Sequence, residues 1–307
     1  MRASRVFRLE LYSRDAPRKR GMMAKKSSIE TYVARADKQR AMARAKTTSP
    51  FGIEVRFLGG LNKKQKDAFA HAADRWCKAI VGDLPPVVVD GEKIDDVLIL
   101  AQGSDIDGAG GILGQAGPDA LRPSNAGKSA YLPAKGTMQF DTADLAKMEA
   151  NGTLDDVITH EMGHVLGIGS IWTNKQLLAG RGTSNPTFRG KGAMQEYGKL
   201  KGTKPAPVPV EGMGGQGTRD SHWREAVFGQ ELMTGYLGNP PNPMSRMTVA
   251  SLGDLGYVVD LDAAEAYSLP NHLLLAERGP VLHDSPPLGH GIMLTRIPLI
   301  LPNDSLA

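Results

Sequence analysis

The chain has 307 residues, of which 41% are hydrophobic and 23% charged, with a formal net charge of +4. This length can hold one large domain or two modest ones with a real core. The apolar run at residues 97–101 is far too short to cross a bilayer, so no membrane span is predicted. A single cysteine, Cys77, excludes intramolecular disulfides.

The positive charge is concentrated at the start of the chain. Residues 1–50 carry 14 Lys or Arg and 4 Asp or Glu, whereas the remainder carries 23 basic and 29 acidic residues. The segment lacks the continuous apolar core of a secretory signal. We therefore predict a solvated, mostly disordered extension, with contact to nucleic acid as the alternative. Localisation stays open between the cytoplasm and export without a signal peptide.

Hydrophobic periodicity predicts the first elements of a folded part that begins near Phe51. Two interior residues of the first helix, Trp76 and Cys77, are expected in the core. The Gly-rich stretch 107–118 is expected to supply an edge strand, on which Gly110–Gly117 could pair with a peptide. The expected elements are strands at 53–57, 87–89, 97–100 and 136–141 and helices at 62–80 and 143–150.

A further helix is predicted from residue 154, because apolar residues recur at helical spacing and Gly167 is placed to end it. Thr153 followed by Asp156 has the pattern of a capping box. Within this helix, residues 160–164 read His-Glu-Met-Gly-His. Histidines four apart lie one turn apart on one helix face, where both imidazoles can bind one metal ion, usually Zn²⁺. Glu161 then lies where a general base for an activated water is needed.

A catalytic zinc site needs a third protein ligand and an open position for water. One group of zinc peptidases continues the motif to a histidine at the position of Ser170, which this chain lacks. The alternative is a glutamate from a later helix. The candidates for it are Glu196, Glu225 and Glu231.

The chain beyond the motif is less regular. Residues 180–217 contain ten Gly and four Pro, which predicts a long ordered loop with a short helix near 193–200. Helical patterns return at 221–232 and 248–255. The segment after Tyr257 shows no clear periodicity, and its histidines are expected at the surface. These are His272, His283 and His290.

Two downstream segments resemble the leishmanolysin-like zinc metallopeptidases. Ser221-His222-Trp223 is followed by Glu231-Leu232-Met233-Thr234-Gly235, with Met233 eleven residues after His222, and residues 245–257 read SRMTVASLGDLGY. The resemblance covers roughly residues 51–257. It implies that His160, His164 and His222 bind one catalytic zinc ion, that Glu161 is the catalytic base, and that Met233 forms the turn below the metal. Without disulfides or an evident signal, the chain looks like a bacterial member.

The resemblance also implies an α+β fold of the metzincin type. We expect a twisted mixed sheet with two long helices above the cleft and a smaller, irregular lower subdomain. The expected divisions are an extension at 1–50, a catalytic domain at 51–260 with a long insertion at about 173–220, and a C-terminal extension at 261–307.

The function expected from these residues is hydrolysis of peptide bonds in proteins by a zinc-dependent endopeptidase. The alternative is a catalytically decayed, zinc-stabilised binding or adhesion module, which would be marked by loss of Glu161 or of a ligand. The expected partner is a protein or peptide substrate, with no specific nucleic acid, and the oligomeric state is unknown. Scattered aspartates in the Gly-rich loops are expected to form turns and not to bind calcium. They are Asp107, Asp119, Asp141 and Asp144.

Overall fold

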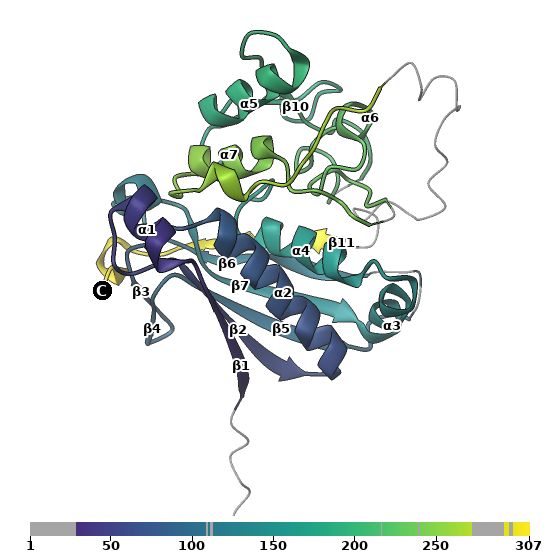
Figure 1. Cartoon of the computed structure of the whole chain (residues 1–307). Coiled ribbons are helices and arrows are strands. Elements are labelled where there is room, and N and C mark those ends of the chain that lie inside the picture. The colour runs from purple at the N-terminus through teal and green to yellow at the C-terminus, as the bar shows by residue number, and fades with distance from the viewer. Residues whose placement is uncertain are drawn as a thin grey trace, which may run out of the picture.

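The computed structural model describes residues 29–108, 110, 113–215, 217–238, 240–271, 292–294 and 297–307. Within these residues the protein is α+β, with one large mixed sheet and seven α-helices (Figure 1). The sheet and two helices form one layer pair, and an irregular part rich in loops lies above them in Figure 1. The mixed α+β fold expected from the sequence is confirmed.

The large sheet has the strand order β1-β2-β5-β7-β6-β11, and β12 also pairs with β6. Strands β2, β5 and β7 are parallel, whereas β1 and β6 run antiparallel to their neighbours β2 and β7. Side chains on β2 alternate between buried Ile53, Val55 and Phe57 and partly exposed Glu54 and Arg56, as the period-two pattern predicted. The strands are β1 (Glu30–Arg35), β2 (Gly52–Gly59), β5 (Val97–Ser104), β6 (Gly114–Leu121), β7 (Pro133–Asp141), β11 (Ile292–Leu294) and β12 (Leu299–Ile300).

Two long helices, α2 (Lys63–Ala79) and α4 (Leu154–Val165), lie side by side on one face of this sheet (Figure 1). Helix α2 begins with a capping box in which Asn62 and Gln65 exchange side-chain hydrogen bonds with each other's backbone N–H. Its Trp76 side chain is fully buried and donates from Nε1 to the Thr159 carbonyl of α4 at 2.9 Å. Cys77 is 2% exposed, so the prediction of a packed core thiol is confirmed.

Asp141 organises the junction between β7 and α3 (Thr142–Asn151). Its carboxylate accepts the N–H groups of Ala143 and Asp144 as the N-cap of α3. The same carboxylate accepts the backbone N–H groups of residues 106–108, which gathers the Gly-rich loop against the helix. Burial acts to raise the pKa of Asp141, but the backbone donors of residues 106–108 and of Ala143 outweigh it and lower the pKa. Asp141 is therefore a turn former, as expected from the sequence.

The irregular part follows α4 in the chain and contains only short elements, from β8 to η2. Helices α5 and α7 pack against each other, and β8, β9 and β10 form a small antiparallel sheet. The elements are β8 (Leu178–Ala179), β9 (Thr187–Phe188), α5 (Lys191–Lys201), β10 (Val208–Pro209), α6 (Glu225–Phe228), α7 (Arg246–Leu255) and the 3-10 turn η2 (Leu261–Ala263). Elsewhere lie the hairpin β3 (Val87–Val89) and β4 (Glu92–Ile94) and the 3-10 turns η1 (Gly127–Ser129) and η3 (Asn303–Ser305).

Part of the segment expected to be a disordered extension is folded. Residues 30–35 form β1, and they are followed by α1 (Lys38–Ala45), which is capped by the Asp37 side chain. Arg40 and Arg44 of α1 form ion pairs with Asp260, so the excess positive charge there has acidic partners far along the chain. The prediction of disorder rested on the high charge of residues 1–50, and it missed these two short elements.

Two local expectations at the helices are wrong. The Thr153 side chain does not cap α4, because its hydroxyl donates to Asn151 Oδ1 at 2.7 Å, and the Asp156 carboxylate is bound by Arg75 and Asn242 instead of the Thr153 N–H. The helical pattern at 221–232 yields only the four-residue α6. The segment around Trp223 is instead extended and bridges Val210 and Thr234. Tertiary contacts override the local pattern at both places.

The outer edge of β6 is already paired. Ile292–Leu294 align in parallel with Gly114–Ala116, and Leu299–Ile300 align with Ala120–Leu121. Leu301 continues this contact by donating its N–H to the Leu121 carbonyl at 2.9 Å and is 6% exposed. The edge expected to lie open for a peptide therefore carries strands from the chain itself.

In the part of the chain that the structure describes, no helix has both the length and the apolar character needed to cross a membrane. The C-terminal histidines predicted at the surface lie outside the described residues, since residues 272–291 are not among them.

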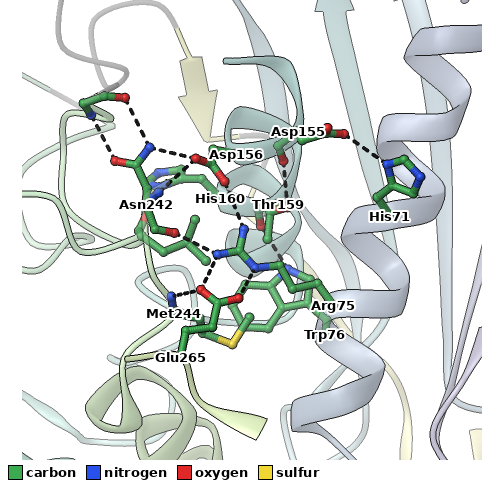
Figure 2. Close-up of polar contacts among 12 residues, drawn as sticks. His71, Arg75, Trp76, Asp155, Asp156, Thr159, His160, Asn242, Met244 and Glu265 are labelled. Atoms are coloured by element: carbon green, nitrogen blue, oxygen red, sulfur yellow. Dashed lines mark hydrogen bonds and ion pairs between the residues drawn. The ribbon is translucent and has the colours of Figure 1, made fainter. Parts of the chain in front are cut away.

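Arg75 of α2 joins α4 to the segments at residues 242–244 and 265 (Figure 2). Its guanidinium donates to Asp156 at 3.0 Å, to both carboxylate oxygens of Glu265 at 2.7 and 2.8 Å, and to the Asn242 carbonyl at 2.8 Å. Asn242 donates its backbone and side-chain N–H groups to the second oxygen of Asp156. One guanidinium thus holds the irregular part against the two long helices.

We expect Arg75→Ala to lower the free energy of unfolding by about 2–3 kcal/mol, because it leaves two carboxylates without their cation. This loss is smaller than that for a fully buried ion pair, because the Glu265 side chain is 39% exposed and screened by solvent. Urea unfolding measures the free energy of unfolding of the variant. The matched control is Arg56→Ala, whose partners Glu54 and Glu92 are 38% and 45% exposed and whose loss should cost less than about 1 kcal/mol. Equal losses for the two variants would contradict this assignment.

Candidate metal centre

Three histidine side chains meet at one point between α4 and the irregular part. His160 and His164 lie one turn apart on α4, and their Nε2 atoms are 3.1 Å apart. The Nε2 atom of His222 lies 3.0 Å from each of them. All three side chains are buried, at 0–2% exposure. The structure therefore brings together the three residues that the sequence resemblance singled out.

His222 lies beside α4 although more than fifty residues separate it from His164, because the chain turns sharply after the helix. Gly167 and Gly169 have φ values of +111° and +74°, which residues other than glycine rarely adopt. A Cβ atom on Gly169 would lie 2.1 Å from the Ser221 carbonyl oxygen, so only glycine permits this approach. Ser170 donates its hydroxyl to the His164 carbonyl at 2.6 Å. The insertion thus delivers His222 beside the position where the shorter motif would place its third histidine.

A backbone carbonyl orients each imidazole. Nδ1 of His160 lies 2.6 Å from the Leu232 oxygen, Nδ1 of His164 lies 2.8 Å from the Ile168 oxygen, and Nδ1 of His222 lies 3.0 Å from the Thr218 oxygen. Carbonyl oxygens only accept hydrogen bonds, so the proton of each neutral ring is assigned to Nδ1. Each Nε2 atom then presents a lone pair to the other two.

Burial keeps the three rings neutral. Desolvation lowers the pKa of His160 to about 3 and that of His164 to about 4, and it holds the pKa of His222 well below its ordinary value. Three lone pairs at 3.0–3.1 Å repel one another unless a cation lies between them. A single ion can lie roughly 2.0–2.1 Å from all three nitrogens, the usual zinc–nitrogen distance. The donor set therefore fits a zinc ion, with a further coordination position left for water.

Glu161 places a carboxylate at the edge of this group. Its Oε1 atom is 3.8 Å from Nε2 of His160, and its Oε2 atom is buried without a hydrogen-bond partner. Burial raises the pKa of Glu161 to about 8. A buried carboxylate oxygen without a partner is costly in a folded protein. Its place beside the histidines suits a group that acts on a water or a substrate.

The Met233 side chain packs below the histidines. A Cβ atom on Gly163, between the two α4 histidines, would lie 2.8 Å from Met233 Sδ and 2.9 Å from Cζ2 of Trp76. Gly163 thus lets the helix approach the buried methionine. The preceding residue, Leu232, supplies the carbonyl that orients His160. Met233 therefore lies in a turn that contacts the helix at the ligand positions.

The glutamates considered as alternative third ligands lie outside the histidine group. Among the described residues, the one set of three or more ligand atoms within 4.8 Å of one another comes from His160, His164 and His222. Glu196 forms ion pairs with Lys199 and Arg246. Glu231 is fully buried and accepts hydrogen bonds from Met233, Ser245 and Thr248. Sequence reasoning did not identify Ser245 and Thr248 as its partners, although both lie in the quoted segment at 245–257.

We expect Gly163→Ala to destabilise the protein and weaken zinc binding. Alanine improves helix propensity by about 1 kcal/mol, but overpacking against the rigid Trp76 ring costs about 1–3 kcal/mol. Urea unfolding and the zinc content of the purified variant measure the two effects. Gly253→Ala in α7 is the control, because its Cβ would make an ordinary 3.4 Å contact with Val259. If both variants gained stability equally, the packing argument at Gly163 would fail.

Residues 127–273 match the family model described as Leishmanolysin, and this span contains the histidine group, Glu161 and Met233. No curated protein matches the chain. The matched family is one of zinc metalloproteases, which agrees with a buried histidine group that could hold a metal ion. Over residues 127–273, the chain is therefore similar to the leishmanolysin family of metallopeptidases.

Proposed function

We propose that this protein is a zinc-dependent metalloendopeptidase of the metzincin type that hydrolyses peptide bonds within proteins. The observation that carries the proposal is the convergence of three Nε2 lone pairs beside a buried carboxylate that has one oxygen without a partner. A histidine group that only stabilised the fold would not need that carboxylate. One zinc ion per chain is proposed, with His160, His164 and His222 as its ligands.

Zinc bound at this site would supply Lewis acidity, which activates a water and polarises a peptide carbonyl. The chain supplies the proton transfer. Glu161 accepts the proton of the attacking water on its carboxylate and passes it to the leaving amine. The same residue thus acts first as general base and then as general acid. Its burial beside His160 excludes bulk water from the transfer.

The chain also orients the three proposed ligands. The three carbonyl groups that accept from Nδ1 keep the imidazoles in the tautomer that can bind a metal. The buried Met233 side chain packs against α4 at Gly163, between the two histidines of the helix. These contacts set the ligand geometry before any substrate is present.

We expect Glu161→Gln to reduce hydrolysis of an unstructured protein such as casein by about 10²–10⁴-fold, the usual contribution of a general base. Zinc content should stay at the wild-type value, because Glu161 is not part of the ligand group. Asp155→Asn is the control. It makes the same chemical change on α4 at a side chain that is 65% exposed and contacts His71. Hydrolysis by Glu161→Gln at the wild-type rate would contradict the proposed base.

We expect one zinc ion per purified chain, removed by a chelator together with peptide hydrolysis and restored by added Zn²⁺. His222→Ala should lower the zinc content and abolish hydrolysis, whereas His71→Ala, at an exposed histidine, should change neither. Metal analysis paired with digestion of a peptide library measures metal, activity and cleavage preference together. Bound zinc without any chelator-sensitive hydrolysis would instead favour the binding module.

A further inference from the structure

Glu231 is a buried carboxylate close in sequence to Met233, outside the group of histidine ligands. Its Oε2 atom accepts the Met233 backbone N–H at 2.7 Å. Its Oε1 atom accepts the Ser245 N–H at 3.1 Å, the Ser245 hydroxyl at 2.7 Å and the Thr248 hydroxyl. All these donors are neutral. Burial raises the pKa of Glu231, and the four hydrogen bonds oppose that effect.

One path from Glu231 leads to His160. The hydrogen bond to the Met233 N–H closes a tight turn around Leu232. That turn presents the Leu232 carbonyl to Nδ1 of His160 at 2.6 Å. Because this bond fixes the tautomer of His160, the carboxylate of Glu231 acts on the ligand through two hydrogen bonds and one peptide unit.

A second path leads to His222 through its neighbour Trp223. The Trp223 N–H donates to the Met233 carbonyl at 3.0 Å, and its indole Nε1 donates to the Thr248 hydroxyl at 2.8 Å. Indole N–H only donates, so the single Thr248 hydroxyl proton is free to go to Glu231. The direction of each bond in the chain Trp223–Thr248–Glu231 is therefore determined.

We propose that Glu231 is a positioning residue of the metal centre, an inference that rests on the proposed function. Its carboxylate holds the turn that orients His160. The same carboxylate, through Thr248, holds the segment that carries His222. The two ligands come from parts of the chain 62 residues apart, and Glu231 is the group that both of their supports share. A hydrophobic residue at this position could not accept the four donors, and an amide would direct an N–H₂ group at some of them.

The test compares Glu231→Gln with Glu196→Gln, which makes the same change at another buried glutamate of the irregular part. Glu196 is 5% exposed and contacts Lys199 and Arg246, away from the turn. Zinc affinity is measured by competition with a chromophoric chelator, and ligand geometry by the visible absorption spectrum of the Co²⁺-loaded protein. We expect Glu231→Gln to weaken zinc binding by about 10–100-fold and to change the Co²⁺ spectrum, as for other partners of metal ligands. Glu196→Gln should leave both unchanged.

A second pair of variants covers the case in which Glu231→Gln does not fold. Thr248→Ser keeps the hydroxyl and should bind zinc as the wild type does, whereas Thr248→Val removes it and should weaken binding in the same direction as Glu231→Gln. If Glu231→Gln and Thr248→Val both matched the wild type in affinity and spectrum, the inference would be overturned. Both readouts are independent of turnover. A wild-type protein that bound zinc but cleaved no peptide would overturn the proposed function and leave the role of Glu231 standing.

Discussion

The arrangement of the three buried histidines depends on three hydrogen bonds from imidazole Nδ1 atoms to backbone carbonyls. The accepting carbonyls belong to Leu232, Ile168 and Thr218, which lie in three different loops. Each fixes one ring in the tautomer that exposes an Nε2 lone pair. Since the lone pairs meet at 3.0–3.1 Å, the arrangement is unfavourable without a cation and favourable with one. The loops that carry these carbonyls must therefore be held in place against the rings.

The supports of the centre form two separate systems. The first is the guanidinium of Arg75, which holds Asp156 of α4, Asn242 and Glu265 together at the N-terminal end of the helix (Figure 2). The second is the carboxylate of Glu231, which collects neutral donors below the ligands. Arg75 resists separation of the helices from the irregular part, and Glu231 sets the turn against His160. In both systems the central side chain is charged and makes several hydrogen bonds, so it can join partners from different segments of the chain.

Elements with strong periodicity could be predicted from the sequence. The helix at 62–80 and the strand at 53–57 agree with α2 and β2 within a few residues, and the two histidines of the helix motif are brought together as their spacing requires. The position of His222 came from resemblance, since no local pattern distinguishes it from a surface histidine. The carbonyls that orient the rings could not be predicted, because a backbone group has no signature in the sequence.

The wrong sequence predictions share one kind of physical cause. Asp156 has the sequence context of a cap, yet its partners come from residues 75 and 242, which no local pattern connects with it. Residues 221–232 have helical spacing, but Trp223 bridges Val210 and Thr234 so that His222 can reach α4. The strand at 30–35 is short, and its partners are β2, with which it pairs, and Lys66 and Asp74 of α2, which contact Glu30 and Tyr32. Long-range partners decide each case.

The pairing of β6 with residues 292–294 and 299–300 has a consequence for any peptide that would bind along this edge of the sheet. Backbone groups of Gly114–Ala116 on β6 pair with the chain's own residues 292–294, on the side of β6 that faces away from β7. A guest peptide that uses this edge must first exchange with them. The free energy of that exchange is subtracted from the free energy of the peptide's own pairing with β6.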